Sequence, residues 1–209
     1  MEQLVWDADE VLWDWVMDFS LMLRGAPVGI LKRSMAHREF LRVKPGVLEL
    51  LWGMHRASLE RALDPYLRIW TNGYAWRLWR IALEIPGFGE LLGPPATGPA
   101  TPTDYAAHPR IFYRHDFVDV ALALREPAAR EAAAEKMSPA ARAVFTEQLV
   151  ERAGDSTLKL PEVAPLVGKD GFAAARVLID DEARNIRRFV ASGRRGIQVI
   201  MPPYAMFGG

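Results

Sequence analysis

Acidic side chains occur in two pairs, each directly after a short apolar segment. Asp7 and Asp9 follow the segment LVW, and Asp180 and Asp181 follow the segment VLI. A D-x-D spacing arises by chance about once in a chain with this much aspartate, so the first pair alone says little. Two pairs at the ends of apolar runs say more, because a buried strand delivers its last side chains to a fixed point. If the pairs meet, a hard divalent cation such as Mg²⁺ must offset their repulsion.

The second acidic pair also has a purely structural interpretation. Asp181 precedes a helix predicted from Glu182 to Ala191, where a carboxylate would accept hydrogen bonds from the free N–H groups of the first turn. That role accounts for one acid but not for two in succession after an apolar strand. We therefore expect both pairs to converge on one cation.

A hydroxyl and an amide follow a third apolar segment. Thr71 and Asn72 come directly after a strand predicted from Tyr66 to Trp70 and before Gly73. The threonine hydroxyl and the backbone N–H groups of this turn would bind phosphate oxygens. The alternative is an ordinary T-N-G turn without a ligand.

One lysine lies in an apolar context. Lys159 sits in the segment TLKLP, and a partly buried lysine needs a partner such as clustered carboxylates and a phosphate. Its competitors are Lys136 and Lys169, and the latter, in GKDG, is predicted to lie in an exposed turn. We expect Lys159 to face the acidic pairs.

Short apolar strands that alternate with amphipathic helices must position these residues. The predicted strands cover residues 4–6, 66–70, 111–113, 117–120, 177–179 and 197–200. The predicted helices cover residues 44–57, 74–83, 127–136, 139–152 and 182–191. This alternation indicates an α/β fold with a mainly parallel sheet, whose active site lies beyond the carboxyl ends of the strands.

Two further segments stand between the predicted strands. Apolar residues recur at helical spacing from Val11 to Leu23 and again from about Ile30 to Leu41, so residues 13–41 are predicted to form a small helical flap. Residues 86–156 are predicted to form an insertion that partly covers the site. The chain, residues 1–209, is expected to be a single domain.

In this order the motifs resemble those of the haloacid dehalogenase superfamily. They are VWDADEV from Val5 to Val11, RIWTNG from Arg68 to Gly73, Lys159, and VLIDDEARNI from Val177 to Ile186. The start D-x-D-x-x-L-W and the end D-D-E-x-R-N-I are most similar to the magnesium-dependent phosphatase family within that superfamily. The resemblance implies a Rossmann-like core in which helices flank a mainly parallel sheet, with the insertion between the second and third motifs.

The resemblance also implies a reaction. Asp7 would be the nucleophile that forms an aspartyl-phosphate, and Asp9 would protonate the leaving oxygen and then activate water. Lys159 would offset charge near Asp7. The expected function is Mg²⁺-dependent hydrolysis of a phosphate monoester. Phosphoryl transfer to another acceptor, or a binding protein on a catalytically retired fold of this type, are the alternatives.

Ligand roles follow from the same resemblance. Thr71, Asn72 and Lys159 would bind phosphoryl oxygens. Mg²⁺ would be held by a set of four acidic residues, one of them through its backbone carbonyl: Asp7, Asp9 (carbonyl), Asp180 and Asp181.

Candidates for substrate contact lie in the flap and the insertion. They are Trp13, Arg114 and His115, and core packing is the alternative for the tryptophan. The substrate is expected to be a phosphorylated small molecule or a phosphoprotein, and the oligomeric state stays open.

The amino-acid composition limits which partners, kinds of site and cellular locations are expected. Lys plus Arg and Asp plus Glu both number 26, so the net charge gives no support for a nucleic-acid partner. The absence of cysteine excludes disulfides, thiolate metal sites and a cysteine nucleophile. The first residues lack the pattern of a signal peptide, and no run of 18 apolar residues occurs. We expect a cytoplasmic protein without membrane contact.

Overall fold

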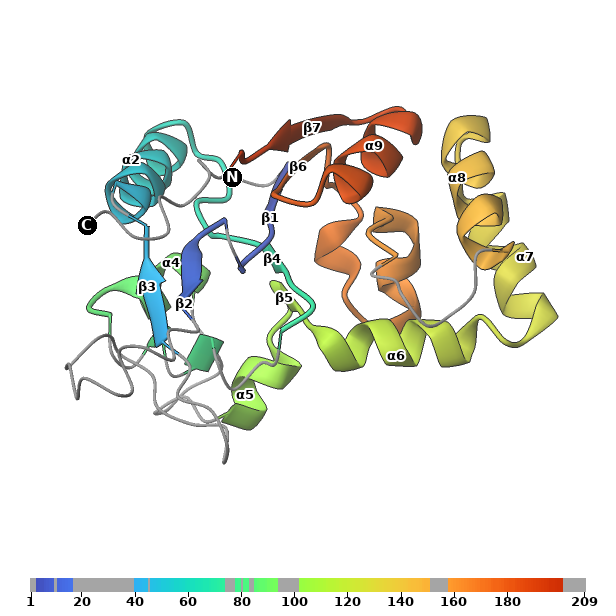
Figure 1. Cartoon of the computed structure of the whole chain (residues 1–209), viewed down its shortest axis with the longest axis horizontal. Helices are drawn as coiled ribbons and strands as arrows, with labels where there is room; N and C mark the ends of the chain where they lie inside the picture. Colours follow the sequence, from blue (N-terminus) through green and yellow to red (C-terminus); the bar gives the residue numbers. More distant parts are fainter. Residues whose placement is uncertain are drawn as a thin grey trace, which may run out of the picture.

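A parallel five-stranded sheet forms the centre of the molecule. The computed structural model describes residues 3–9, 11–16, 40–44, 46–73, 78–79, 81–82, 85–93, 102–150 and 158–200. The sheet contains β1 (Leu4–Trp6), β4 (Ile69–Trp70), β5 (Ile111–Phe112), β6 (Val177–Asp180) and β7 (Arg195–Gln198). All four neighbouring pairs are parallel, in the order β5–β4–β1–β6–β7 (Figure 1). The predicted α/β class with a parallel sheet is confirmed.

The strand order determines where a ligand is expected to bind. From β1 the chain adds β4 and β5 on one side, and then crosses back to add β6 and β7 on the other. The direction of winding therefore reverses between β1 and β6. In open sheets of this kind, ligands bind in the crevice outside the carboxyl ends of the strands at that reversal point.

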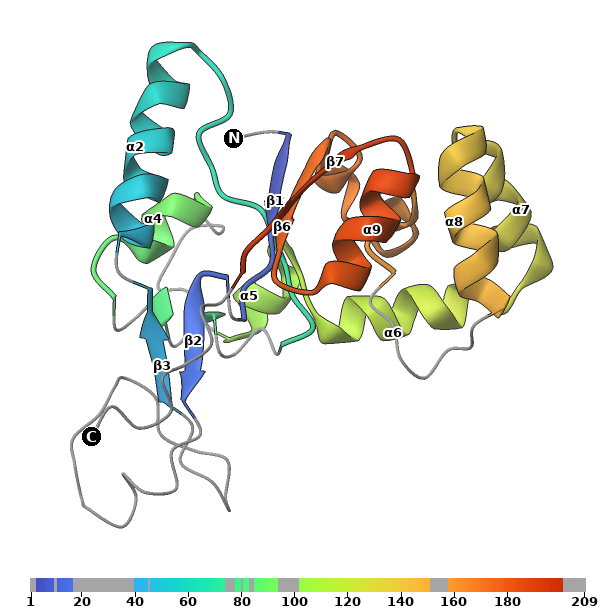
Figure 2. The same cartoon turned by 45° about the horizontal axis from the view of Figure 1, so that its top comes forward.

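Helices cover both faces of the sheet, and the strands are apolar on both sides for that reason. Successive strand residues enter different clusters: Trp6 and Ile69 belong to one, whereas Val5 and Trp70 belong to the other. The first cluster is completed by α2 (Val47–Glu60) and α4 (Phe88–Leu92). The second is completed by α6 (Arg114–Ala123), α7 (Pro127–Glu135), α8 (Pro139–Val150), the 3-10 turns η1 (Pro161–Val167) and η2 (Asp170–Phe172), and α9 (Ala183–Ala191). Figure 2 shows α2 and α9 on opposite sides of β1 and β6.

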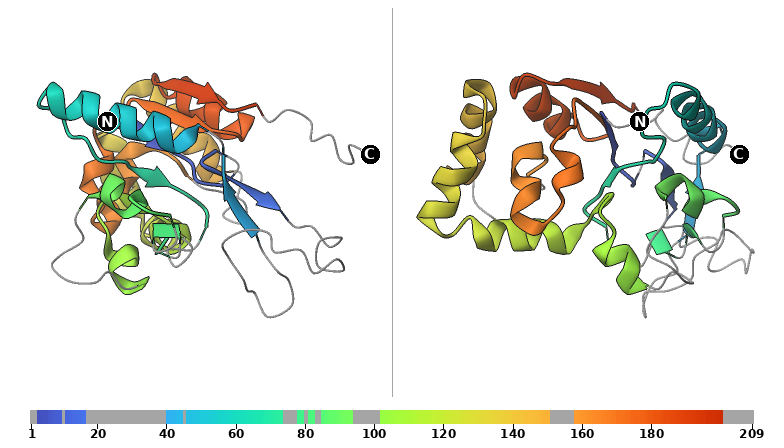
Figure 3. Two further views of the ribbon diagram at one scale, coloured as in Figure 1. Left: turned by 90° about the vertical axis from the view of Figure 1, so that its left-hand side faces the viewer. Right: turned by 180° about the vertical axis from the view of Figure 1, so that it is seen from behind.

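The flap is a β-hairpin where the structure describes it. β2 (Trp13–Val16) pairs antiparallel with β3 (Phe40–Val43), and the pair extends away from the sheet (Figure 3). The prediction of helix is therefore wrong for residues 13–16 and 40–41. Residues 17–39 lie outside the described residues. The W-D-W-V sequence of β2 suits a strand, because aromatic and β-branched residues favour pleated backbone.

The prediction of a strand at Phe117–Val120 is also wrong, because this segment lies inside the helix α6. The carboxylate of Asp116 accepts a hydrogen bond from the N–H of Tyr113 at 2.9 Å and so closes the first turn of this helix.

The other predictions differ from the structure mainly at their boundaries. β4 is shorter than predicted, and β7 begins two residues before the predicted 197–200. The predicted helices 127–136, 139–152 and 182–191 correspond to α7, α8 and α9. Residues 86–156 contain α4 to α8, with α5 at Pro102–Ala107, and also β5, so part of the predicted insertion belongs to the central sheet. Within the described ranges, no helix has the length and apolar character that crossing a bilayer requires.

Candidate functional site

Two carboxylates and one ammonium group form a buried ionic cluster at the reversal point. Asp7 directly follows β1 and Asp180 ends β6; these strands are in register, with Trp6 opposite Ile179. Lys159 Nζ donates to Asp7 Oδ1 at 2.9 Å and to Asp180 Oδ2 at 2.6 Å. Asp7, Asp180 and Lys159 are 8%, 0% and 5% exposed. The structure thus brings together three residues that the sequence predicted to meet.

Asp180 also accepts hydrogen bonds from the residues that follow it in the chain. Its Oδ1 accepts a hydrogen bond from the N–H of Glu182 at 2.8 Å, and Asn185 Nδ2 lies 3.3 and 3.2 Å from its two oxygens. The residue that caps α9 is Glu182, whose side chain accepts from the N–H of Arg184. The interpretation of Asp181 as the helix cap is therefore wrong. Asn185 was given no role from the sequence, although it lies in the motif after the Asp-Asp pair.

Three carboxylates are close enough to share one cation. Asp7, Asp180 and Asp181 each offer an oxygen, and these atoms all lie within 4.8 Å of one another. Ligand oxygens of an octahedral Mg²⁺ ion lie about 2.1 Å from the metal and so about 3–4 Å from each other. An all-carboxylate donor set suits a hard ion of this kind. The predicted backbone ligand, the carbonyl of Asp9, stays a prediction.

The electrostatics of this cluster favour an additional positive charge. Burial raises the pKa of Asp7 to about 7; Lys159 opposes this shift, whereas Asp180 adds to it. Burial and the neighbouring Asp180 also raise the pKa of Asp181. Burial by itself would lower the pKa of Lys159, but Asp7 and Asp180 raise it above its usual value. The single positive charge of Lys159 therefore does not balance the negative charge of the three carboxylates, and a bound cation would supply the missing positive charge.

Asp9 is positioned by two side chains. Trp13 Nε1 donates to Asp9 Oδ1 at 2.9 Å, and the hydroxyl of Thr71 lies 3.5 Å from Asp9 Oδ2. The same hydroxyl oxygen accepts a hydrogen bond from the N–H of Gly73 at 2.9 Å, which forms the turn after β4. Trp13 is buried, and its ring packs edge-on against Phe88. The tryptophan thus contributes an N–H group to Asp9 and does not offer an exposed ring to a ligand.

The remaining predicted contacts lie at the carboxyl ends of β4 and β5. Asn72 is exposed in the turn after β4, and Arg114 and His115 are exposed at the start of α6. The N–H of Arg114 donates to the carbonyl of Gly73 at 3.1 Å, so the two strand ends are connected. These residues line the same edge of the sheet as Asp7, and their contact with substrate stays a prediction.

A second buried lysine was missed. Lys169 is 5% exposed, and its Nζ donates to the carbonyls of Ala106 at 3.1 Å and His108 at 2.8 Å. The predicted exposed turn is therefore wrong. Lys136 is exposed. Of the three candidates, Lys159 is the lysine that contacts Asp7.

Comparisons with known proteins find no relative of this chain. No family model matches the chain, and neither a curated protein nor a solved structure matches it. The chemistry of the site is therefore argued from its own residues.

Proposed function

We propose that this chain is a Mg²⁺-dependent phosphatase of the haloacid dehalogenase type that hydrolyses a phosphate monoester through an aspartyl-phosphate on Asp7. One observation carries the proposal. A nucleophilic carboxylate, a buried lysine and the carboxylates of Asp180 and Asp181 meet at the carboxyl edge of a parallel sheet, at its reversal point. The order of the motifs along the chain supports the same reaction.

The reaction has two steps. In the first, a carboxylate oxygen of Asp7 attacks phosphorus, the bond from phosphorus to the ester oxygen breaks, and Asp9 gives a proton to that oxygen. In the second, Asp9 takes a proton from water as the water attacks phosphorus. The bond to Asp7 then breaks and inorganic phosphate leaves. The hydrogen bond from Trp13 keeps Asp9 oriented for both proton transfers.

The other residues stabilise the charge on the transferred group. Lys159 places its ammonium group beside the attacking oxygen, where it offsets charge that develops on the phosphoryl oxygens. The hydroxyl of Thr71 and the turn at Asn72 supply donors to the same group. Asp7, Asp180 and Asp181, with the Asp9 carbonyl, would hold Mg²⁺, which supplies charge neutralisation to the phosphoryl group.

The first test is hydrolysis of 4-nitrophenyl phosphate with Mg²⁺. We expect Asp7→Asn to lower kcat roughly 10³-fold or more, because the variant has no nucleophile. Asp119→Asn, which changes an exposed carboxylate on α6, is the matched control and should keep full activity. Chelation should abolish turnover and added Mg²⁺ should restore it. Full activity of Asp7→Asn would exclude the covalent mechanism.

Two outcomes distinguish the alternatives. If added alcohols divert phosphate from water to a new ester, the protein is a phosphotransferase on the same site. If a panel of phosphate esters is not turned over but calorimetry detects Mg²⁺ with beryllium fluoride, the chain is a binding protein with this fold. Binding of neither, and no turnover, would reject the proposal entirely.

A second test needs no substrate. We expect Mg²⁺ to raise the thermal unfolding temperature above about pH 7 and to lose this effect as the pH falls, because protons then occupy Asp7, whose pKa is about 7. Calorimetric melting at several pH values, with and without Mg²⁺, measures this. Asp7→Asn should show a much smaller Mg²⁺ effect at every pH. A Mg²⁺ shift that is equal in the variant would place the ion elsewhere.

A further inference from the structure

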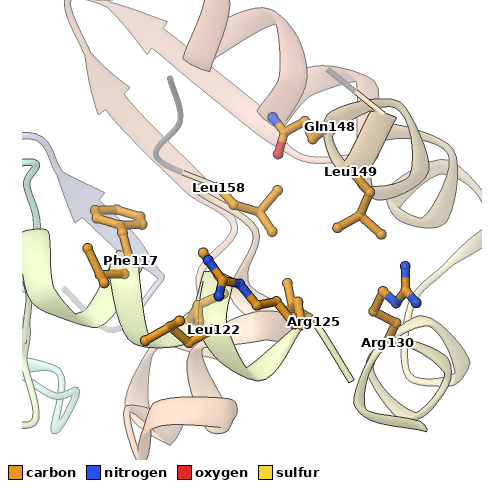
Figure 4. A pocket seen from close by; sticks show the side chains of 11 residues that line it. Phe117, Leu122, Arg125, Arg130, Gln148, Leu149 and Leu158 are labelled. Carbon is orange, nitrogen blue, oxygen red and sulfur yellow. The ribbon is translucent and has the colours of Figure 1, made fainter. Parts of the chain in front are cut away.

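A cavity of about 390 Å³ lies among α6, α7 and α8, on the face of the sheet that carries the second core cluster (Figure 4). Its walls are mostly apolar and include Phe117 and Leu124 from the α6 side and Leu158 from the segment that leads to Lys159. This volume lies within the range of small-molecule sites, about 300–1,000 Å³, which typically combine apolar walls with a few polar groups.

The charged side chains among the described wall residues are both arginines. Arg125 follows α6 and Arg130 lies on α7, and no acidic side chain is among the described residues that line the cavity. A guanidinium group stays charged at any physiological pH. The cavity therefore favours an anion, and a planar carboxylate matches the fork of an arginine side chain.

A buried acceptor provides a second, independent observation. Gln148 extends from α8 toward Leu158 (Figure 4) and is 8% exposed. Its Oε1 atom is buried and accepts no hydrogen bond from the described residues. A buried acceptor without a donor is unfavourable, so a ligand that brings an N–H group would be stabilised here.

Apolar side chains on the same helices are open to solvent. Val118 and Leu122 on α6 are 49% and 47% exposed, and Leu149 on α8 is 38% exposed, and all three line the cavity. An apolar ligand that covers them removes this surface from water. The cavity is therefore suited to a ligand that has an apolar body, a negative charge and a hydrogen-bond donor.

We propose that this cavity binds an N-acyl amino acid: an apolar acyl chain in the cavity, an amide N–H directed to Gln148, and a carboxylate paired with one of the two arginines of the wall, Arg125 or Arg130. The acyl chain contacts the walls that include Phe117 and Leu158. The inference does not depend on the proposed function, because binding needs neither Mg²⁺ nor Asp7.

Calorimetric titration tests it with three probes and no divalent ion. N-decanoylglycine carries all three features and should bind. N-decanoylglycinamide lacks the charge and should bind at least roughly tenfold more weakly, and dodecanoate lacks the N–H group and should bind severalfold more weakly. No binding of N-decanoylglycine at about 1 mM, or equal binding of the neutral amide, would overturn the proposal.

Variants locate the ligand. Ala121→Trp places a large ring in the cavity wall and should abolish binding, whereas Ala132→Trp, on the exposed side of α7, should not change it. One of the variants Arg125→Gln and Arg130→Gln should weaken binding of N-decanoylglycine, and neither should change binding of N-decanoylglycinamide. Because Ala121→Trp can disturb the fold as well as fill the cavity, circular dichroism checks that the variant is folded. The two arginine variants test the site without filling it. Binding that survives all three substitutions places the ligand elsewhere and rejects the site.

Discussion

Lys159 and Lys169 have the same exposed fraction but different electrostatic surroundings. Both side chains are 5% exposed. Lys159 donates to two carboxylates, Asp7 and Asp180, and these raise its pKa against the effect of burial. Lys169 donates to two backbone carbonyls and lies 3.9 Å from Asp116; burial prevails there and lowers its pKa.

The difference shows that burial of a charged group is not a sign of function by itself. Lys169, directly before η2, is connected to the end of α5 and to the residues that follow it, and its hydrogen-bond partners are neutral carbonyls that need donors. Lys159 donates to Asp7 and Asp180, and the pKa values of Asp7 and of the neighbouring Asp181 are raised, which is the arrangement of a site that lacks one positive charge. The partners of a buried lysine therefore separate a structural role from a catalytic one.

The largest expected effect is on catalysis. Under the proposed function, Lys159→Met should lower kcat for 4-nitrophenyl phosphate roughly 10²–10³-fold, because it removes a charge that stabilises the transition state. Lys169→Met should keep kcat and KM near the wild-type values. Steady-state kinetics with saturating Mg²⁺ measures both. An equal loss in the two variants would remove the distinction between the lysines.

The next effect is on stability, and it needs no activity. In metal-free buffer at about pH 8, Lys159→Met should lower the free energy of unfolding by about 3–5 kcal/mol, because it leaves two buried carboxylates without their cation. Lys169→Met should cost about 1–3 kcal/mol through unpaired carbonyls. Urea titration measures the differences, and Lys136→Met, at an exposed position, should change stability by less than about 0.5 kcal/mol. A smaller loss in Lys159→Met than in Lys169→Met would contradict the charge argument.

The smallest effect is a difference in pH dependence. The pKa of Lys169 is lowered below 10.5, so its charge costs stability at neutral pH and this cost is relieved as the pH rises toward 10.5. The pKa of Lys159 is raised above 10.5, so its stabilisation is complete below 10.5 and is lost only as the pH rises through the higher value.

Between about pH 8 and 10.5, the stability difference between wild type and Lys169→Met should therefore grow. The difference for Lys159→Met should stay constant over the same interval. Urea titrations at several pH values compare the two slopes. A difference for Lys169→Met that shrinks with rising pH would show that its pKa is not lowered.

Much of the site was predictable because strand ends converge. Asp7 and Asp180 each follow an apolar run, and parallel strands bring their carboxyl ends to one edge whatever lies between them. Lys159 was predictable from its apolar neighbours. In each case the residues next to the functional side chain in the sequence were enough to predict its position.

The errors concern residues whose surroundings come from distant parts of the chain. Lys169 lies between glycines that are typical of an exposed turn, but the carbonyls that bury it belong to residues 61 and 63 positions earlier. Trp13 lies in a segment whose apolar residues recur at helical spacing, yet it pairs with Val43 of β3, a partner that spacing does not reveal.

The position of β1 in the sheet has a consequence for how the chain folds. β1 is formed by residues 4–6, and one of its two neighbours, β6, is formed by residues 177–180. Lys159 is 152 positions from its partner Asp7. Contacts over such separations form slowly, since a long loop must close before they stabilise anything. One edge of β1 therefore stays unpaired until residues 177–180 have been synthesised, and an unpaired strand edge can pair with other chains in the meantime.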